Sequence, residues 1–543
     1  MGARFAFLIS AVSIAYGFLL FHLYEVQLLR GSSYLVQAES QDNLQNFQTA
    51  RRGSIYFADK NGNRMLVASK KGFPEIYAVP KEIGDIEEAS HILSLALGTP
   101  AEGLVVKLGD KKSNYVSLLK RAPGETLKKI EEVGFKGIYT REIAGRFYPF
   151  GDLAAQTLGF VGPDEKANGE SGRYGIEKFY NDLLSGVAGT TDESDSSMPG
   201  EDLVLTIDPN IQKQAEVSLA KLLGETKALS GSVLVEDPAT GKILAMASFP
   251  GYDPNIYTSF ALKYFLNPAI EHIYEPGSVF KVFTMSAGID SGKITPDTSF
   301  YDSGSVVISG HKIENWDHKA HGMVTMTNVI ELSMNTGTAF AVKTMGGSVL
   351  ASYFKKFGFG EKSGIDLPGE LKGNISRLVP KAPAIAFATA GFGQGVSVTP
   401  LQLINAVSAI ANGGKLMRPY LNSERKPEVI RQVMTPETAA KVTKMMVSAV
   451  DKAGVAKIEG FSIAGKTGTA QVPNFIKGGY TNQVIDTYVG FGPTINPRFV
   501  VLFKIDEPPG APLAGTTVVP AFKEIAQFIL RYLDVPQDRI ATQ

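Results

Sequence analysis

Ser278 and Lys281 lie three positions apart in the sequence, at a spacing that allows nucleophilic chemistry. Pro276 and Gly277 interrupt whatever element precedes them, so we expect a helix to begin at Ser278 and to continue through the apolar run 279–287. Because residues three apart share one face of a helix, the serine hydroxyl is predicted to touch the lysine amine. A desolvated amine can take the proton of such a hydroxyl, and the oxygen can then attack a carbonyl carbon.

Two further motifs follow, and both carry residue types that suit acyl transfer: Ser333-Met334-Asn335 and Lys466-Thr467-Gly468-Thr469. The first comes after a helical run, 324–332, and the second lies in a strand-like stretch, 461–472. Gly465 and Gly468 in that stretch are expected to let a substrate backbone approach. A lone Ser-x-x-Lys recurs by chance and can simply be a serine cap on a helix. The three motifs in this order, however, are the signature of penicillin-binding proteins and class A β-lactamases.

The composition of the chain excludes several classes of protein. Its 543 residues are enough for about three domains. The 54 basic and 54 acidic residues give a formal net charge of zero, which argues against a nucleic-acid-binding protein because such proteins carry a basic excess. The absence of cysteine excludes disulfides, thiol catalysis and cysteine-ligated metal sites. The Gly-rich stretch 391–395 is not followed by Lys-Ser or Lys-Thr, so a phosphate-binding loop is not expected.

A hydrophobic segment near the N-terminus predicts a membrane anchor. Residues 5–24 contain no Lys, Arg, Asp or Glu and are almost wholly apolar, over about the 20 residues that a helix needs to span a bilayer. Arg4 precedes them, which predicts a cytoplasmic N-terminus and a catalytic domain outside the membrane. A cleaved signal peptide is the alternative, but no Ala-x-Ala-like site follows. We therefore expect 1–30 to anchor the chain, uncleaved, in the cytoplasmic (inner) membrane as a single-pass protein.

Turn and linker signals divide the remaining chain into two domains and a tail. A linker rich in Gly, Ser, Thr and acidic residues, 186–202, separates a pedestal domain, 31–200, from a catalytic domain, 201–535. The last residues, 536–543, are expected to form a short C-terminal tail. All three motifs lie in the catalytic domain, so the pedestal is predicted to be structural.

Local patterns predict an α+β fold. In the pedestal, Asn61-Gly62 predicts the turn of a hairpin, and 87–97 and 124–133 have helical spacing. In the catalytic domain, strands and helices are expected at both ends of a large helical centre: strands 203–208, 231–236, 243–248, 487–491 and 498–505, and helices 209–223 and 521–533. This arrangement favours a sheet packed between helices.

These segments together resemble the class B penicillin-binding proteins, which are peptidoglycan D,D-transpeptidases. Besides the anchor and the three motifs, the resemblance rests on six short stretches: Arg52-Gly53-Ser54-Ile55, Asn61-Gly62, Arg146-Phe147-Tyr148-Pro149, Gly175-Ile176-Glu177, Leu205-Thr206-Ile207-Asp208 and Thr399-Pro400-Leu401-Gln402. It covers nearly the whole length, and no segment resembles the glycosyltransferase domain of class A proteins. It implies a mixed α/β pedestal of the dimerisation type. It also implies a serine transpeptidase domain, like that of β-lactamases, with a five-stranded antiparallel sheet flanked by helices.

The resemblance implies a role for each residue of the first two motifs. Ser278 resembles the nucleophile that is acylated, and Lys281 its general base, kept neutral by burial and by a second cation nearby. Ser333 would relay a proton to the leaving amine, and Asn335 would hold both Lys281 and the substrate amide. Met334 stands where class A β-lactamases carry Asp, a position that varies among class B proteins.

The third motif is implied to bind the substrate. Lys466 and Thr467 would hold its terminal carboxylate through charge-assisted hydrogen bonds. Gly468 and Thr469 complete this substrate-binding stretch. The backbone N–H groups of Ser278 and Thr469 would form the oxyanion hole. No metal and no other cofactor is implied.

A cluster of histidines around the single tryptophan, Trp316, raises the alternative of a zinc site: His311, His318 and His321. No carboxylate or cysteine completes a recognisable set of zinc ligands. Exposed or structural histidines are therefore the simpler interpretation.

The resemblance also implies a substrate and partners. The substrate would be the D-Ala-D-Ala end of a peptidoglycan stem peptide: D-Ala leaves, and the amine of a neighbouring stem peptide attacks the acyl-enzyme. β-Lactam antibiotics such as penicillin would acylate the same serine. A glycan polymerase of the SEDS family and membrane proteins of the divisome, the cell-division assembly, are the implied protein partners.

Two alternatives remain for the biological role. The stretches 274–278, 505–508 and 519–523 look more like the division type of class B protein than the elongation type, which stays as the first alternative. The second is a membrane-anchored penicillin sensor. Such sensors usually carry more membrane spans or a cytoplasmic effector domain, whereas only about four residues are expected on the cytoplasmic side here.

Overall fold

The computed structural model of the chain describes residues 16–19, 22, 52–164, 169–186, 198–474 and 476–539. Contacts between residues divide the chain into two compact units. The described part of the smaller unit is mainly Ser69–Phe147, and the larger unit contains Ser54–Ala68, Tyr148–Leu184 and the chain from Asp202 onward. Two segments of the expected pedestal thus group with the catalytic motifs, while the boundaries at residues 30, 200 and 535 stay predictions.

Among the described residues, none of the helices has the length and apolar character needed to cross a membrane. The predicted span, 5–24, lies outside the described residues except for 16–19 and 22. The predicted linker, 186–202, is described only at its two ends. Both therefore stay predictions from the sequence.

The smaller unit is an antiparallel sheet with helices packed beside it. Residues 69–78 of the long strand β2 (Arg64–Ala78) pair with β4 (Ile138–Phe147) and, near their end, with β3 (Val116–Leu119). The helices follow in chain order: α3 (Ile86–Leu97), α4 (Ala101–Leu108) and α5 (Gly124–Val133). The helices predicted over 87–97 and 124–133 are confirmed as α3 and α5. The side chain of Asp85 caps α3 by accepting hydrogen bonds from two backbone N–H groups.

The larger unit begins with the predicted hairpin. β1 (Ile55–Ala58) pairs antiparallel with residues 64–68 of β2 and parallel with β7 (Leu203–Leu205). Gly62 in the turn has a φ of 82°, which favours glycine. Short elements fill the chain before β7: α6 (Ala155–Leu158), β5 (Val161–Asp164), β6 (Gly169–Gly172), α7 (Gly175–Phe179) and α8 (Asn181–Ser185).

The centre of the larger unit is a five-stranded sheet in which every neighbouring pair is antiparallel. Its strands in spatial order are β16 (Ala464–Pro473), β17 (Tyr480–Gly492), β18 (Phe499–Asp506), β8 (Ser230–Glu236) and β9 (Ile243–Phe249). Successive side chains of β8 pack into two different hydrophobic cores. Val233 and Val235 belong to one core, and Leu234 belongs to the other. Because both faces are covered, β9 and β18 are largely apolar rather than alternating, whereas β16 carries the polar residues of the third motif.

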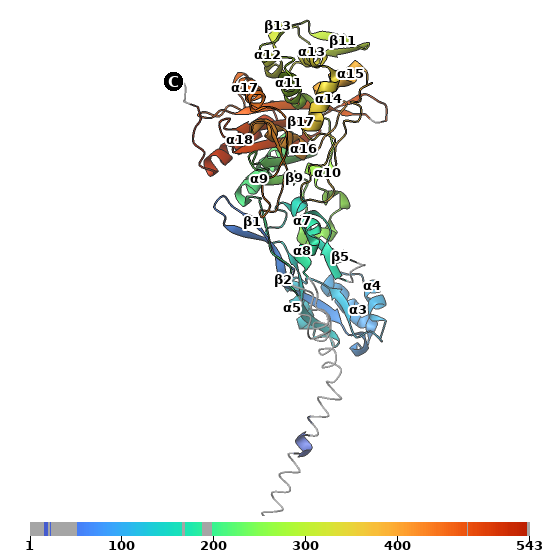
Figure 1. Ribbon diagram of the computed structural model, residues 1–543. Coiled ribbons are helices and arrows are strands. Elements are labelled where there is room, and N and C mark those ends of the chain that lie inside the picture. The colour runs from blue at the N-terminus through green and yellow to red at the C-terminus, as the bar shows by residue number, and fades with distance from the viewer. Residues whose placement is uncertain are drawn as a thin grey trace, which may run out of the picture. The chain divides into compact units, whose positions relative to one another are not determined.

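Helices cover both faces of this sheet (Figure 1). α9 (Pro209–Thr226) and α18 (Val518–Tyr532) share one core with it, whereas α11 (Lys281–Asp290) and α16 (Pro400–Ala411) belong to the other. α17 (Pro436–Ala453) packs against β16. The strands and helices expected in the catalytic domain are confirmed with small shifts at their ends, except that β17 begins at Tyr480 rather than at residue 487.

A helical region with three small two-stranded sheets carries the second motif. Its helices are α12 (Met326–Glu331), α13 (Asn335–Met345), α14 (Gly347–Lys356) and α15 (Ala384–Gly391). The paired strands are β10 (Ser299–Asp302) with β13 (Gly322–Thr325), β11 (Ser305–Ile308) with β12 (His311–Glu314), and β14 (Lys415–Met417) with β15 (Val429–Gln432). The helical run expected over 324–332 is therefore shorter than predicted, because its first residues pair as a strand.

Candidate active site

Ser278 lies in a single 3-10 turn, Gly277–Phe280, that leads directly into α11. The predicted helix start is confirmed, but its first turn is tighter than an α-helix. Val279 and Phe280 are fully buried and fix this turn to the core, while Ser278 stays partly exposed. Its side chain lines a cleft of about 450 Å³.

Lys281 begins α11 and is 0% exposed. Its amine donates to the backbone carbonyl of Ser333 and, at 3.2 Å, to the Ser333 hydroxyl. Burial lowers the pKa of Lys281 well below its usual range, and the nearby charge of Lys466 lowers it further. The general base that the resemblance implies is thus buried next to a second cation.

The predicted contact between Ser278 and Lys281 is not a hydrogen bond in this structure. Within the described part of the chain, no hydrogen bond joins the two side chains, because the amine is held by Ser333 instead. Catalytic hydrogen bonds in unliganded enzymes often form only when the substrate is bound, so the observed geometry does not exclude the pair.

Lys466, which lies on the five-stranded sheet, contacts Ser333 as well. It lies on β16, opposite Val489 of β17, and is 4% exposed. Its amine donates to the hydroxyl of Ser333 at 3.0 Å and to the carbonyl of Thr467 at 3.1 Å. Burial lowers the pKa of Lys466 to about 7. The hydroxyl of Ser333 therefore lies between two amines that both lose protons far more readily than a free lysine.

Asn335 is placed differently from expectation. It is the first residue of α13, and its side-chain nitrogen donates to the carbonyl of Glu314 at 2.9 Å. Across the described residues, no hydrogen bond links Asn335 to Lys281. Holding the lysine and the substrate amide stays a prediction for Asn335.

The threonines of the third motif line the cleft with Lys466. The hydroxyl of Thr469 donates to Asp486 at 2.9 Å and accepts from the backbone N–H of Ala514 at 3.0 Å. Burial raises the pKa of Asp486 to about 6. The side chain of Thr469 is therefore tied to the sheet. The hydroxyl of Thr467 accepts from Lys466 at 3.3 Å and donates to no other side chain in the part of the chain that the structure describes.

The two glycines of this strand lie where a side chain would not fit, and access for a substrate backbone stays a prediction for them. A Cβ at Gly465 would lie 2.0 Å from the hydroxyl of Tyr488. A Cβ at Gly468 would lie 2.5 Å from the carbonyl oxygen of Pro276, in the turn before Ser278. Their absent side chains let β16 lie close to its neighbour strand and to the turn that carries the nucleophile.

Trp316 and Asp317 also line the cleft, which the sequence analysis did not predict. The Trp316 ring is 55% exposed, and its Nε1 donates to the carbonyl of Leu332 at 3.0 Å, directly before the second motif. His321 pairs with Asp317 at 3.1 Å. No group of three potential metal ligands occurs among the described residues. The tryptophan's rarity in this sequence was the one signal that could have marked it.

The comparisons with known proteins agree with this geometry. Residues 231–527 match the family described as the penicillin binding protein transpeptidase domain, and 47–203 match the penicillin-binding protein dimerisation domain. The chain belongs to the class B penicillin-binding proteins. Members of this family are serine transpeptidases, and the resemblance that the three motifs indicated is confirmed.

Several class B relatives align along most of their length. Stage V sporulation protein D of Bacillus subtilis is 33% identical, over 86% of this chain and 76% of the relative. Peptidoglycan D,D-transpeptidase FtsI of Escherichia coli is 28% identical, over 99% and 93%. The crystal structure of penicillin binding protein 3 from Mycobacterium tuberculosis, complexed with aztreonam, superposes with a TM-score of 0.71 at 25% identity, over 91% of this chain and 100% of that one.

Proposed function

We propose that this class B penicillin-binding protein cross-links peptidoglycan stem peptides through an acyl-enzyme on Ser278. The observation that supports this most directly is the hydroxyl of Ser333, which lies within hydrogen-bonding distance of the amines of Lys281 and Lys466. Burial lowers the pKa of both amines, so a neutral amine is available to accept a proton near neutral pH.

In the first half-reaction, Oγ of Ser278 bonds to the carbonyl carbon of the penultimate D-Ala, and its proton passes to the neutral amine of Lys281. The tetrahedral intermediate then collapses as the D-Ala–D-Ala peptide bond breaks. The leaving amine takes a proton from the hydroxyl of Ser333, and Lys281 returns a proton to Ser333. The products are an ester on Ser278 and free D-Ala.

In the second half-reaction, the amine of a neighbouring stem peptide attacks the ester and gives up a proton through Lys281. Ser278 regains its hydroxyl proton, and the new peptide bond is the cross-link. The N–H groups of Ser278 and Thr469 bind the oxyanion, and loss of one such donor typically slows an enzyme about 10²–10³-fold. The terminal carboxylate of the substrate pairs with Lys466 and Thr467, which charges Lys466 when substrate binds.

Mapping a covalent adduct tests the nucleophile. A fluorescent penicillin should label the full chain on Ser278, and Ser278→Ala should abolish labelling. Ser291→Ala is the matched control, because Ser291 ends the same helix and, among the described residues, donates only to backbone carbonyls of that helix. An adduct that mass spectrometry places on any other serine contradicts the assignment.

We further propose that the chain is held in the cytoplasmic membrane by residues 1–30 and acts in septal wall synthesis with a SEDS-family polymerase and divisome proteins. The apolar segment 5–24 and the similarity to FtsI support this. A chain exported without 1–30 should still acylate but should fail to support growth. Depletion should block septation and give long, unseparated cells. Rounded cells would instead assign the chain to elongation and leave the transpeptidase chemistry untouched.

A further inference from the structure

A second cavity lies in the larger unit, beside the helix that begins with Asn335. Its volume is about 630 Å³, within the usual range for sites that bind small molecules. β10, β11, α13 and α15 contribute its walls. The described residues that line it are all different from those that line the active-site cleft.

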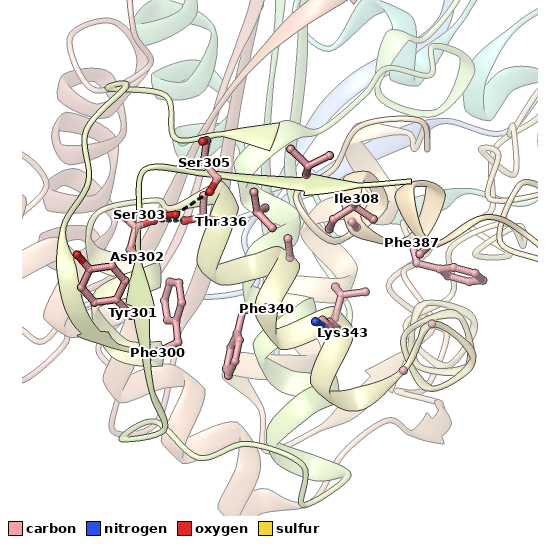
Figure 2. A pocket seen from close by; sticks show the side chains of 18 of the residues that line it. Phe300, Tyr301, Asp302, Ser303, Ser305, Ile308, Thr336, Phe340, Lys343 and Phe387 are labelled. Carbon is pink, nitrogen blue, oxygen red and sulfur yellow. Dashed lines mark hydrogen bonds between the residues drawn. The ribbon is translucent and has the colours of Figure 1, made fainter. Parts of the chain in front are cut away.

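Apolar side chains form most of the cavity wall (Figure 2). Phe300 and Phe340 stack with their ring centroids 5.1 Å apart. Figure 2 shows them on one side of Lys343 and Phe387 on the other. Phe387 is held against α14, where a Cβ at Gly347 would lie only 2.5 Å from its ring. The cavity therefore suits a ligand with a rigid apolar body of about two rings.

Two side chains that carry charge line the cavity, and only one of them is free to bind a ligand. The carboxylate of Asp302 is buried and accepts four hydrogen bonds, which come from Gly304, Asn315, His321 and Thr336. Lys343 on α13 is exposed and makes no ion pair with any described residue. The electrostatic preference of the cavity is therefore for an anion.

We propose that this cavity binds an amphiphilic organic anion, a molecule with an apolar two-ring body and one carboxylate that pairs with Lys343. The aromatic walls take the apolar body, and the exposed amine takes the charge. Such a ligand would bury its rings between Phe340 and Phe387 while its carboxylate stays at the mouth.

Occupancy of this cavity should also change the active site. Thr336 lines the cavity and directly follows Asn335. Its hydroxyl donates to Asp302 at 2.8 Å, and its backbone N–H donates to Asn315 at 3.2 Å. Asn315 precedes Trp316, which lines the cleft. A ligand that shifts Thr336 therefore moves groups next to Ser278. This coupling rests on the proposed function, whereas binding itself does not.

A fluorinated probe tests binding on the full chain. We expect 4′-fluorobiphenyl-4-carboxylate to bind saturably at one site per chain, and ¹⁹F NMR measures this binding. Lys343→Glu should raise its Kd at least tenfold, yet change the Kd of the uncharged analogue 4′-fluorobiphenyl-4-methanol less than twofold. Lys355→Glu, an exposed lysine on α14 that does not line the cavity, is the matched control and should leave both values unchanged.

Ala384→Phe tests the location, because Ala384 is exposed at the mouth of the cavity and a ring there occupies the space. It should weaken both probes at least tenfold, with an unchanged melting temperature. In the wild type, a saturating probe should change the rate of penicillin acylation at least twofold, and Ala384→Phe should remove that effect. An equal Kd of the carboxylate probe for wild type and Lys343→Glu refutes the proposal. So does probe binding that is lost when Ser278 is acylated but is unchanged in Ala384→Phe, because the probe would then bind in the active-site cleft.

Discussion

Removing the charge of Lys466 should shift the pH dependence of acylation. The amines of Lys281 and Lys466 both contact the hydroxyl of Ser333, at 3.2 and 3.0 Å. The two nitrogens are therefore at most about 6 Å apart, and two positive charges at that distance repel by about 3 kcal/mol at an effective dielectric constant near 20. This repulsion lowers the pKa of Lys281 when Lys466 is charged, in addition to the effect of burial.

The sign of the shift follows from which form reacts. Only neutral Lys281 accepts the serine proton, so the acylation rate falls on the acidic side of its pKa. In Lys466→Ala the repulsion is gone, the pKa of Lys281 rises, and the acidic limb of the pH–rate profile should move to higher pH. The maximal rate should also fall, because Lys466 is proposed to bind the carboxylate of the penicillin, so the position of the limb is the quantity to compare.

The second-order rate constant for acylation by a fluorescent penicillin, measured from about pH 5 to 10, gives the acidic limb of the pH–rate profile directly. Lys441→Ala on α17 is the matched control, since Lys441 is exposed and lies outside the residues lining the cleft. Its limb should coincide with that of the wild type. A limb that stays in place in Lys466→Ala would show that Lys281 is not the group that titrates.

Three further changes test the rest of the reasoning. Lys281→Arg should slow acylation by about 10²–10⁴-fold, because Arg cannot be deprotonated in proteins, and a normal rate would make the lysine structural. Gly465→Ala should cost about 1–3 kcal/mol of stability by pressing on Tyr488, and an unchanged melting temperature would show that the strand tolerates a side chain there. Burial raises the pKa of Glu236 to about 8, so its carboxyl stabilises the fold at low pH and loses that contribution as pH rises from 4.5 toward 8. Glu236→Gln should remove a fall of about 5 kcal/mol over that range, and parallel stability profiles for the two proteins would disprove it.

The parts of the fold that depend on local pattern could be predicted. The helix start at Ser278, the hairpin turn at Asn61-Gly62 and the strand around Lys466 each follow from residues adjacent in sequence. The place of Trp316 in the cleft could not, because the indole is positioned by a hydrogen bond to the carbonyl of Leu332, which is distant in sequence. The close packing at Gly465 and Gly468 could not be predicted for the same reason, since the atoms that exclude a side chain there come from Tyr488 and Pro276.

The position of Ser333 shows why the catalytic groups resist prediction from local pattern. Its φ of 54° is unusual for a residue other than glycine and costs on the order of 1–3 kcal/mol, so no propensity would assign it. The surrounding structure maintains it: the N–H of Met334 donates to Val329 at 3.0 Å, and the carbonyl and hydroxyl of Ser333 accept from Lys281. In that conformation the hydroxyl meets both lysines, which are themselves costly to bury. Strain and buried charge thus coincide at one serine, and the apolar core around α11 provides the stability that offsets both.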